Sequence, residues 1–373
     1  MNIAIIGGGN VGTFLAGEFT KKGNIVSIYT RDKSRWKKEI TILDKDTNLE
    51  YTYTPYKITE NVKEAVEMAD IIFITLPAFA SKEFIEKSKN YIKPNTYVGF
   101  YPGTGGIEFI SKDLIEKGCT IFGTQRISSV VRLKKYGEYV ITAGKRKELF
   151  LGAIPYNKVE EVSKIVSILL DIKINPLPNY LSVSLTPSNP ILHPTRLYSI
   201  FKDYQEGMVY KNIPLFYEDW TDEASTYLIK CDKELHQILN KIKVDTSHIV
   251  PLLKHYESKN EETLTNKIRS IQSFRGITTP SIKIENGYIP DLSNRYFTAD
   301  FPYGLIIIKS FGMICNIKTP TIDMIIDWYQ SIVKKQYIDI EKNVLGKDSK
   351  ELSLPQLYDI KTIEDIENYY IKR

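Results

Sequence analysis

The chain begins with a short apolar run that leads directly into a glycine-rich turn. Residues 3–6 read Ile-Ala-Ile-Ile, and residues 7–12 read Gly-Gly-Gly-Asn-Val-Gly, which has the spacing G-x-G-x-x-G. From Val11 to Phe19, apolar residues recur at helical spacing. Strand, glycine turn and helix in this order are typical of the first unit of a dinucleotide-binding sheet. A coincidental glycine turn is the alternative interpretation.

Each position of this turn has its own predicted role. Gly7 permits the tight turn, Gly9 lets the backbone approach a pyrophosphate, and Gly12 lets the helix pack closely on the strand. Asn10 and Val11, at the start of the helix, complete the predicted cofactor-binding set, because the phosphates would lie at the positive end of the helix.

The choice of dinucleotide is usually made at the end of the second strand, which we place at Ile25–Tyr29. NAD enzymes prefer an acidic residue there, whereas this chain has Thr30 and Arg31, with further basic residues at 33 and 35. Such a cluster can meet a 2′-phosphate through charge-assisted hydrogen bonds, which favours NADP(H). NAD(H) is the alternative, with Asp32 as the ribose ligand and the basic residues as solvated surface charges.

Strand and helix patterns alternate through the first half of the chain. Residues 69–77 read as a buried strand, and Pro77 would lie at the carboxyl edge of the sheet, where such folds bind ligands. An ordinary strand-ending proline is the alternative. Further strands are predicted at 97–101, 119–123 and 139–143, and helices at 62–68, 79–91, 107–117 and 159–170. We therefore expect an α/β fold, with a Rossmann-type doubly wound parallel sheet over residues 1–185 as the dinucleotide-binding domain.

From residue 195 onward the apolar period becomes helical. Long helices are predicted at 220–242, 301–315 and 321–333. A long aromatic-rich loop, 276–299, interrupts them, and residues 340–373 have only weak periodicity. Residues 186–373 are therefore predicted to form an all-α domain that carries the substrate-binding and catalytic groups.

A proline-rich segment joins the two halves. Residues 186–195 read Thr-Pro-Ser-Asn-Pro-Ile-Leu-His-Pro-Thr. Because proline biases the residue before it toward extended conformations, we expect a stiff, extended segment that presents His193. Histidine is the natural general acid or base at neutral pH. The alternative is a half-buried histidine that closes a hinge between the domains.

Two further candidates lie at the end of the long loop. Arg295 opens the run Arg-Tyr-Phe-Thr-Ala-Asp, which ends at Asp300. Long loops without a repeat often carry function. Taken alone, Asp300 is explained as the N-cap of the helix that follows, and Arg295 as a surface residue.

Composition limits the partners and the compartment. The net charge is only +5 over 373 residues, with basic and acidic residues interleaved, so nucleic acid is not an expected partner. No apolar stretch reaches about 18 residues, so no membrane partner is expected either. The three cysteines, at 119, 231 and 315, have neither metal-ligand nor disulfide spacing. We expect a cytoplasmic protein without a metal site.

Taken together, these motifs resemble the octopine/nopaline (opine) dehydrogenase family, in which a Rossmann domain precedes a helical domain. The resemblance extends from about Met1 to Val333. It rests on the glycine turn, on Asn189 to Pro194, and on the five-residue separation of Arg295 and Asp300. The resemblance implies that His193 and Asp300 form a catalytic pair and that Arg295 holds a keto acid. It also implies that Asn189 contacts substrate.

The resemblance implies reductive condensation of an amino acid with an α-keto acid such as pyruvate, through an imine, to an N-(carboxyalkyl) amino acid. The two small molecules would be the partners, and a homodimer is compatible with the sequence. One alternative is an NAD(P)-dependent reductase of a 2-keto or 3-hydroxy acid that uses no amine. The other is a dinucleotide-sensing protein without enzymatic activity, which would not need a histidine, an arginine and an aspartate in these motifs.

Overall fold

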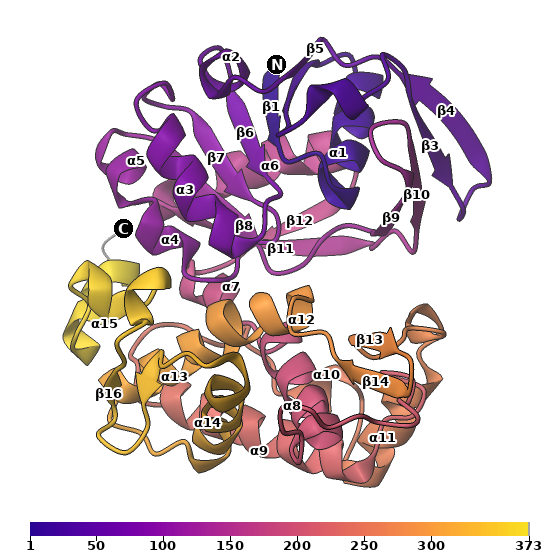
Figure 1. Ribbon diagram of the computed structural model, residues 1–373. Coiled ribbons are helices and arrows are strands. Elements are labelled where there is room, and N and C mark those ends of the chain that lie inside the picture. Colours follow the sequence, from indigo (N-terminus) through magenta and orange to yellow (C-terminus); the bar gives the residue numbers. More distant parts are fainter. Residues whose placement is uncertain (372–373) are drawn as a thin grey trace. The chain divides into compact units, whose positions relative to one another are not determined.

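A computed structural model describes residues 1–371 of the chain. The chain divides into two compact units, Met1–Ser184 and a second unit that begins at Leu185 (Figure 1). Each unit has its own buried apolar core. Among the described residues, no helix is both long enough and apolar enough to cross a membrane.

The first unit is built on an eight-stranded sheet in the order β12-β11-β8-β7-β6-β1-β2-β5. Neighbouring strands from β8 to β5 run parallel, whereas β11 is antiparallel to β8 and parallel to β12. The predicted doubly wound parallel sheet is therefore confirmed. The strands are β1 (Asn2–Ile6), β2 (Ile25–Tyr29), β5 (Lys57–Thr59), β6 (Ile71–Ile74), β7 (Tyr97–Phe100), β8 (Thr120–Thr124), β11 (Glu148–Ile154) and β12 (Lys173–Pro176).

Helices cover both faces of this sheet. Ile3 and Ile5 of β1 share one core with helices α1 (Asn10–Lys21) and α6 (Val159–Leu170), and the residues between them face the other way. Because β1 is buried on both faces, its apolar run is continuous instead of alternating. Four further helices lie on the opposite face (Figure 1): α2 (Val62–Val66), α3 (Ala78–Ser88), α4 (Ile107–Ile110) and α5 (Lys112–Glu116).

A second sheet packs against α1 and was not predicted as a sheet. Its order is β4-β3-β10-β9, and its side chains join the core on the α1 side. Figure 1 shows it beside α1, away from α3 and α4. Two of its strands are inserted between β2 and β5, where the basic run 31–38 hides their pattern. The strands are β3 (Ile40–Asp44), β4 (Leu49–Tyr53), β9 (Val130–Lys135) and β10 (Tyr139–Ala143).

The second unit is helical, as predicted, and α9 (Asp222–Leu239) contacts most of its other helices. Glu234 of α9 is buried, and its carboxylate accepts hydrogen bonds from the N–H groups of Thr321 at 2.8 Å and Ile322 at 3.0 Å. These are first-turn N–H groups of α14, so the negative charge caps its positive end. The other helices are α8 (Asn189–Phe201), α10 (Leu252–His255), α11 (Glu261–Ser270), α12 (Arg295–Thr298), α13 (Ile306–Ile314), α14 (Pro320–Val333) and α15 (Ile363–Ile371).

Small strands and short turns complete the fold. The predicted loop 276–299 contains a hairpin of β13 (Ser281–Ile284) and β14 (Gly287–Pro290), followed by α12. A second hairpin joins β15 (Ile338–Asp339) to β16 (Val344–Leu345). A short helix, α7 (Leu181–Ser184), ends the first unit. Single turns of 3₁₀ helix occur at η1 (Lys33–Arg35), η2 (Tyr156–Lys158), η3 (Gln272–Phe274), η5 (Ser349–Glu351) and η6 (Pro355–Tyr358).

The predicted extended conformation around His193 is wrong, because residues 189–201 form helix α8. Pro190 lies in the first turn, where its missing N–H would have had no helical acceptor. Pro194 lies inside the helix and removes one backbone hydrogen bond. The helix persists because its apolar side chains are buried, with Ile191 and Leu197 fully enclosed. The stiffness expected of this segment therefore comes from a buried helix.

Candidate active site

The glycine turn forms an open cradle at the start of α1. Gly7 has a φ of +109°, a conformation that favours glycine, and Gly9 occupies the N-cap position without any side-chain cap. A Cβ atom added to Gly9 would meet nothing within 4 Å, whereas one added to Gly12 would lie 1.8 Å from the Gly7 carbonyl oxygen. The turn therefore leaves main-chain N–H groups open toward an anion while the helix packs tightly on the strand.

Two other predicted cofactor residues start α1. The side-chain oxygen of Asn10 accepts a hydrogen bond from the N–H of Leu133 at 2.9 Å, so this side chain holds β9. Val11 is partly buried and packs against the core of the unit. Both side chains are used within the protein, so a role of these two residues at a phosphate would fall to their main-chain N–H groups.

The end of β2 is closed by two aromatic residues that the sequence analysis did not single out. The buried Thr30 hydroxyl lies 2.9 Å from the Tyr136 hydroxyl and accepts a hydrogen bond from the Trp36 indole N–H at 3.3 Å. The indole also reaches the glycine turn, since a Cβ atom at Gly8 would lie 2.3 Å from it. Thr30 is therefore a buried anchor for this aromatic pair, and Arg31 beside it is exposed.

The carboxylate of Asp32 is used locally. It accepts hydrogen bonds from the N–H and hydroxyl of Ser34, which cap the short turn η1, and the hydroxyl bond in particular lowers the pKa of Asp32. Pro77 precedes α3 and is exposed. Because β1, β2 and β6 are parallel neighbours, Pro77, Gly7 and Thr30 all lie at one edge of the sheet.

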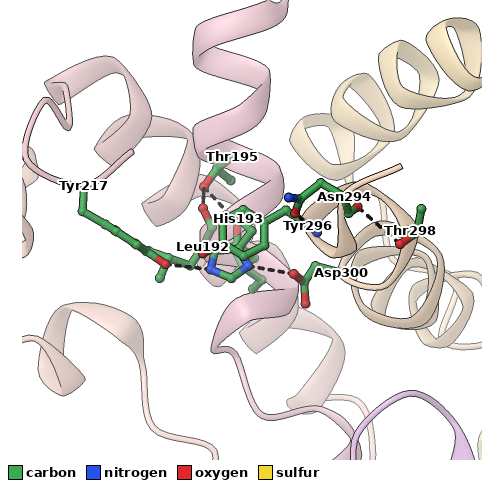
Figure 2. A network of polar contacts seen from close by, with 9 residues as sticks. Leu192, His193, Thr195, Tyr217, Asn294, Tyr296, Thr298 and Asp300 are labelled. Carbon is green, nitrogen blue, oxygen red and sulfur yellow. Dashed lines mark hydrogen bonds and ion pairs between the residues drawn. The ribbon is translucent and has the colours of Figure 1, made fainter. Parts of the chain in front are cut away.

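The structure brings His193 and Asp300 together. The two residues are 107 positions apart, yet Nδ1 of His193 lies 2.7 Å from Oδ2 of Asp300 (Figure 2). The His193 side chain is 2% exposed and that of Asp300 is 17% exposed. A carboxylate in this place fixes the imidazole with its proton on Nδ1 and stabilises the cation that forms when Nε2 takes up a proton.

Aromatic side chains enclose the imidazole. The ring of Tyr296 stacks on His193 with centroids 3.8 Å apart and planes at 22°, and Phe216 meets it edge-on at 5.6 Å. The hydroxyl of Tyr217 lies 2.7 Å from Nε2, on the side of the ring opposite Asp300 (Figure 2). The imidazole is therefore contacted on one face by Tyr296, edge-on by Phe216, and at both nitrogens.

The predicted substrate-binding residues do not contact the pair in this structure. Asn189 is exposed at the start of α8, one helical turn before His193. Arg295 is exposed at the start of α12, with its guanidinium 5.6 Å from the ring centre of Tyr296. Because Tyr296 also stacks on His193, the guanidinium of Arg295 and the imidazole of His193 both contact the ring of Tyr296.

Asp300 occupies the position expected of an N-cap but does not act as one. It precedes the π-helical turn η4 (Phe301–Leu305), and its side chain makes no capping hydrogen bond. We expect Asp300→Asn to lower turnover about 10–100-fold, because the neutral amide cannot stabilise the imidazolium. Steady-state assays and thermal melts of the same preparation test this. A lower melting temperature with unchanged turnover per folded molecule would instead assign Asp300 a purely structural role.

Tyr217 and Phe216 belong to the site although no motif in the sequence marks them. With 25 tyrosines and 15 phenylalanines in the chain, one more aromatic pair carries no signal by itself. Tyr296 is different, because it directly follows Arg295 and could have been named from that position.

Comparison with known proteins covers both halves of the chain. Residues 176–333 match the family described as NAD/NADP octopine/nopaline dehydrogenase, alpha-helical domain, and residues 3–146 match ketopantoate reductase PanE/ApbA. Tauropine dehydrogenase of Arabella iricolor is 27% identical over 98% of this chain and 99% of its own length. Octopine dehydrogenase of Pecten maximus is 24% identical over 98% of both chains.

A solved structure supports the same assignment at the level of the fold. Octopine dehydrogenase described with NADH and L-arginine aligns with a TM-score of 0.87 at 23% identity, covering 98% of this chain and 97% of that one. The full-length relatives span both halves, and the helical half carries the family's own match. On these grounds the resemblance to the octopine/nopaline (opine) dehydrogenase family that the motifs predicted is confirmed, through the family's helical-domain match and through relatives that are similar along almost the whole chain.

Proposed function

We propose that the protein uses NAD(P)H to condense an amino acid with an α-keto acid, yielding an N-(carboxyalkyl) amino acid. The observation that carries this proposal is the hydrogen bond between His193 and Asp300, the two residues that the family resemblance pairs. The proposal is supported by the similarity of this chain to tauropine, octopine and opine dehydrogenases along almost their whole length. The protein is thus an oxidoreductase, and its proposed bond change is at CH–NH.

The two parts of the chain divide the work in this proposal. Residues 1–185 would bind the dinucleotide, and residues 186–373 would supply the substrate-binding and acid/base groups. The cradle fits a pyrophosphate, since a Cβ at Gly9 would enter open space and the first N–H groups of α1 have no side-chain cap. A reduced nicotinamide bound there supplies the hydride.

His193 would move the proton that the chemistry requires at the substrate oxygen. When the amine adds to the keto carbon, the carbinolamine oxygen must be protonated to leave as water, and an imidazolium can provide that proton. Asp300 would stabilise the imidazolium through its bond to Nδ1. Arg295 would bind the keto-acid carboxylate through two parallel hydrogen bonds, and Asn189 would add a polar contact.

The reaction is tested by following oxidation of NADPH and NADH with a panel of α-keto acids, each with and without amino acids, and by mass analysis of the products. We expect oxidation to depend on the amine and to give a secondary amine product. Full-rate oxidation with the keto acid alone, yielding a hydroxy acid, would favour the simple reductase. Binding without any turnover would favour the sensor.

For the cofactor we propose a preference for NADP(H) over NAD(H). Asp32 is engaged with Ser34, and Thr30 with its two aromatic neighbours, while the guanidinium of Arg31 is exposed at the end of β2. A 2′-phosphate would find a cation there, whereas Asp32 already accepts two hydrogen bonds at Oδ1 and has only Oδ2 to offer a ribose hydroxyl.

Arg31→Ala should weaken NADPH binding about 10–100-fold and leave NADH binding nearly unchanged, since losing a charge-assisted contact costs about 1.5–3 kcal/mol. Dissociation constants of both cofactors, measured by calorimetry, test this. Lys38→Ala, which removes an exposed charge from the same surface run, is the matched control. Equal affinities of the wild-type protein for NADPH and NADH would refute the preference.

The proposed location is the cytoplasm. Cys119, Cys231 and Cys315 are all free and buried, as expected of packing residues in a reducing compartment.

A further inference from the structure

Both nitrogens of His193 already have partners within the second unit. Nδ1 lies 2.7 Å from Asp300 and Nε2 lies 2.7 Å from the Tyr217 hydroxyl. The side chain is 2% exposed, and the ring of Tyr296 covers one of its faces. Tyr217 is almost as buried, at 4% exposed, so burial alone does not separate the two groups. What separates them is the bond between them: a substrate oxygen that bonded Nε2 would have to take the place of the Tyr217 hydroxyl and leave a buried phenol without this partner.

Tyr217 is suited to be a neutral donor. Burial, together with the nearby Tyr296, raises the pKa of Tyr217 well above its usual value, so its hydroxyl keeps its proton at neutral pH. With Nδ1–H donated to Asp300, an unprotonated Nε2 can accept the phenolic hydrogen, and a protonated Nε2 can donate to the phenol oxygen. Asp300, His193 and Tyr217 then form one continuous hydrogen-bonded chain (Figure 2).

The same helix that carries His193 also positions Tyr217. Arg196, one turn further along α8, is 2% exposed and donates hydrogen bonds to three backbone carbonyls. Its Nε bonds the carbonyl of Phe216 at 2.9 Å, and its Nη2 bonds those of Leu215 at 3.3 Å and Asp219 at 2.6 Å. The segment 215–219 is thus fixed to α8, and the phenol is held against the imidazole.

Stacking holds the other end of the phenol. The ring of Tyr217 stacks on Phe274 with centroids 4.1 Å apart and on Trp220 at 6.3 Å, with interplanar angles of 19° and 7°. A phenol held by two stacked rings and an anchored backbone has little freedom to swing aside. This arrangement suits transfer through the hydroxyl better than its displacement.

We propose that Tyr217 carries the proton between His193 and the substrate oxygen, so that the phenol is the acid that meets the substrate. This inference rests on the proposed function. In the dehydration step the nitrogen lone pair forms the C=N bond, the C–O bond breaks, and its electrons stay on oxygen. That oxygen takes the phenolic proton, and the phenol oxygen takes the proton from Nε2 of the imidazolium. Water, an iminium ion, a neutral phenol and a neutral imidazole result, so charge and atoms balance.

Tyr217→Phe tests the relay, because it keeps the stacked ring and removes only the hydroxyl. We expect single-turnover cofactor oxidation to slow by about tenfold or more, within the usual range for a positioned proton donor. Tyr329→Phe is the matched control, since it removes another buried hydroxyl of this unit and that side chain makes no contact with His193. Wild-type turnover in Tyr217→Phe would overturn the proposal.

The number of protons that move in the transition state gives a second readout. In mixtures of H₂O and D₂O, the wild-type single-turnover rate should fall along a bowed curve, because two protons move together. Tyr217→Phe should give a straight line. A straight line for the wild-type protein would show a single transfer and would also overturn the relay.

A third measurement needs no activity. The chain has only four histidines, so ¹⁵N-histidine spectra are simple, and His193→Gln identifies the signal of His193 by its loss. Tyr217→Phe should shift the Nε2 resonance of His193, whereas Tyr329→Phe should not. An unchanged resonance would show that Nε2 and the Tyr217 hydroxyl are not hydrogen-bonded in solution, and it would overturn the relay. If the wild-type protein instead reduces keto acids without an amine, the proposed function fails and the relay is judged on that reaction.

Discussion

His193→Asn should lower turnover by about 10²–10⁴-fold, the usual contribution of a positioned acid/base group. Asparagine fills a similar volume and can still accept or donate one hydrogen bond, but it cannot take up and release a proton at neutral pH. Cofactor affinity should not change, because the glycine cradle belongs to the first unit and His193 to the second. Steady-state kinetics and cofactor titrations on the same preparation measure both effects.

His248→Asn is the control for this experiment, since His248 is an exposed histidine of the same unit. It should leave turnover unchanged. Loss of cofactor binding in His193→Asn would indicate a disturbed fold. Near-normal turnover with intact binding would exclude His193 as the acid/base group.

Gly12→Ala should destabilise the first unit by about 3 kcal/mol or more and abolish cofactor binding at ordinary concentrations. The new Cβ would lie 1.8 Å from the carbonyl oxygen of Gly7 and 2.8 Å from the Thr75 hydroxyl. The first of these contacts is to backbone, which cannot move without displacing α1 from β1. Thermal or denaturant unfolding measures the loss.

Gly9→Ala is the matched substitution with the opposite expectation. Its Cβ would meet nothing within 4 Å, and its φ of −79° suits any residue, so stability should be unchanged. Dinucleotide affinity should nevertheless fall about tenfold or more, because the methyl group stands where a pyrophosphate must approach. Unchanged affinity in Gly9→Ala would place the dinucleotide elsewhere.

The first-unit sheet was predictable because its signals are local. Ile25–Tyr29 and Val159–Leu170 were assigned with the bounds that the structure gives, since each is a continuous apolar or helically periodic run between clear turns. The strand 139–143 was predicted, but no local signal shows that it pairs with β3 and β9, and the other strands of the second sheet were missed because they are partly exposed. In the second unit, the prolines around His193 suggested an extended chain, and burial of α8 outweighed that local preference.

The candidate site was predictable only in part. His193, Arg295 and Asp300 stood out through a family pattern, and the bond between His193 and Asp300 gives that pattern a geometry. Tyr217 has no such pattern. Its proposed role depends on a tertiary contact, because Arg196 holds the backbone of residues 215–219 in place. No motif in the sequence marks that contact.

The placement of Asp300, His193 and Tyr217 within a single unit has an evolutionary consequence. All three lie after residue 185, whereas the glycine cradle and the aromatic pair at Thr30 lie before it. Mutations in the first unit that change the dinucleotide preference therefore leave the sequence around the proposed proton-transfer groups unchanged. Mutations around those groups likewise leave the glycine cradle unchanged. Recombination near residue 185 would exchange one inherited trait at a time, so a lineage can change its electron donor while it keeps its acid/base chemistry.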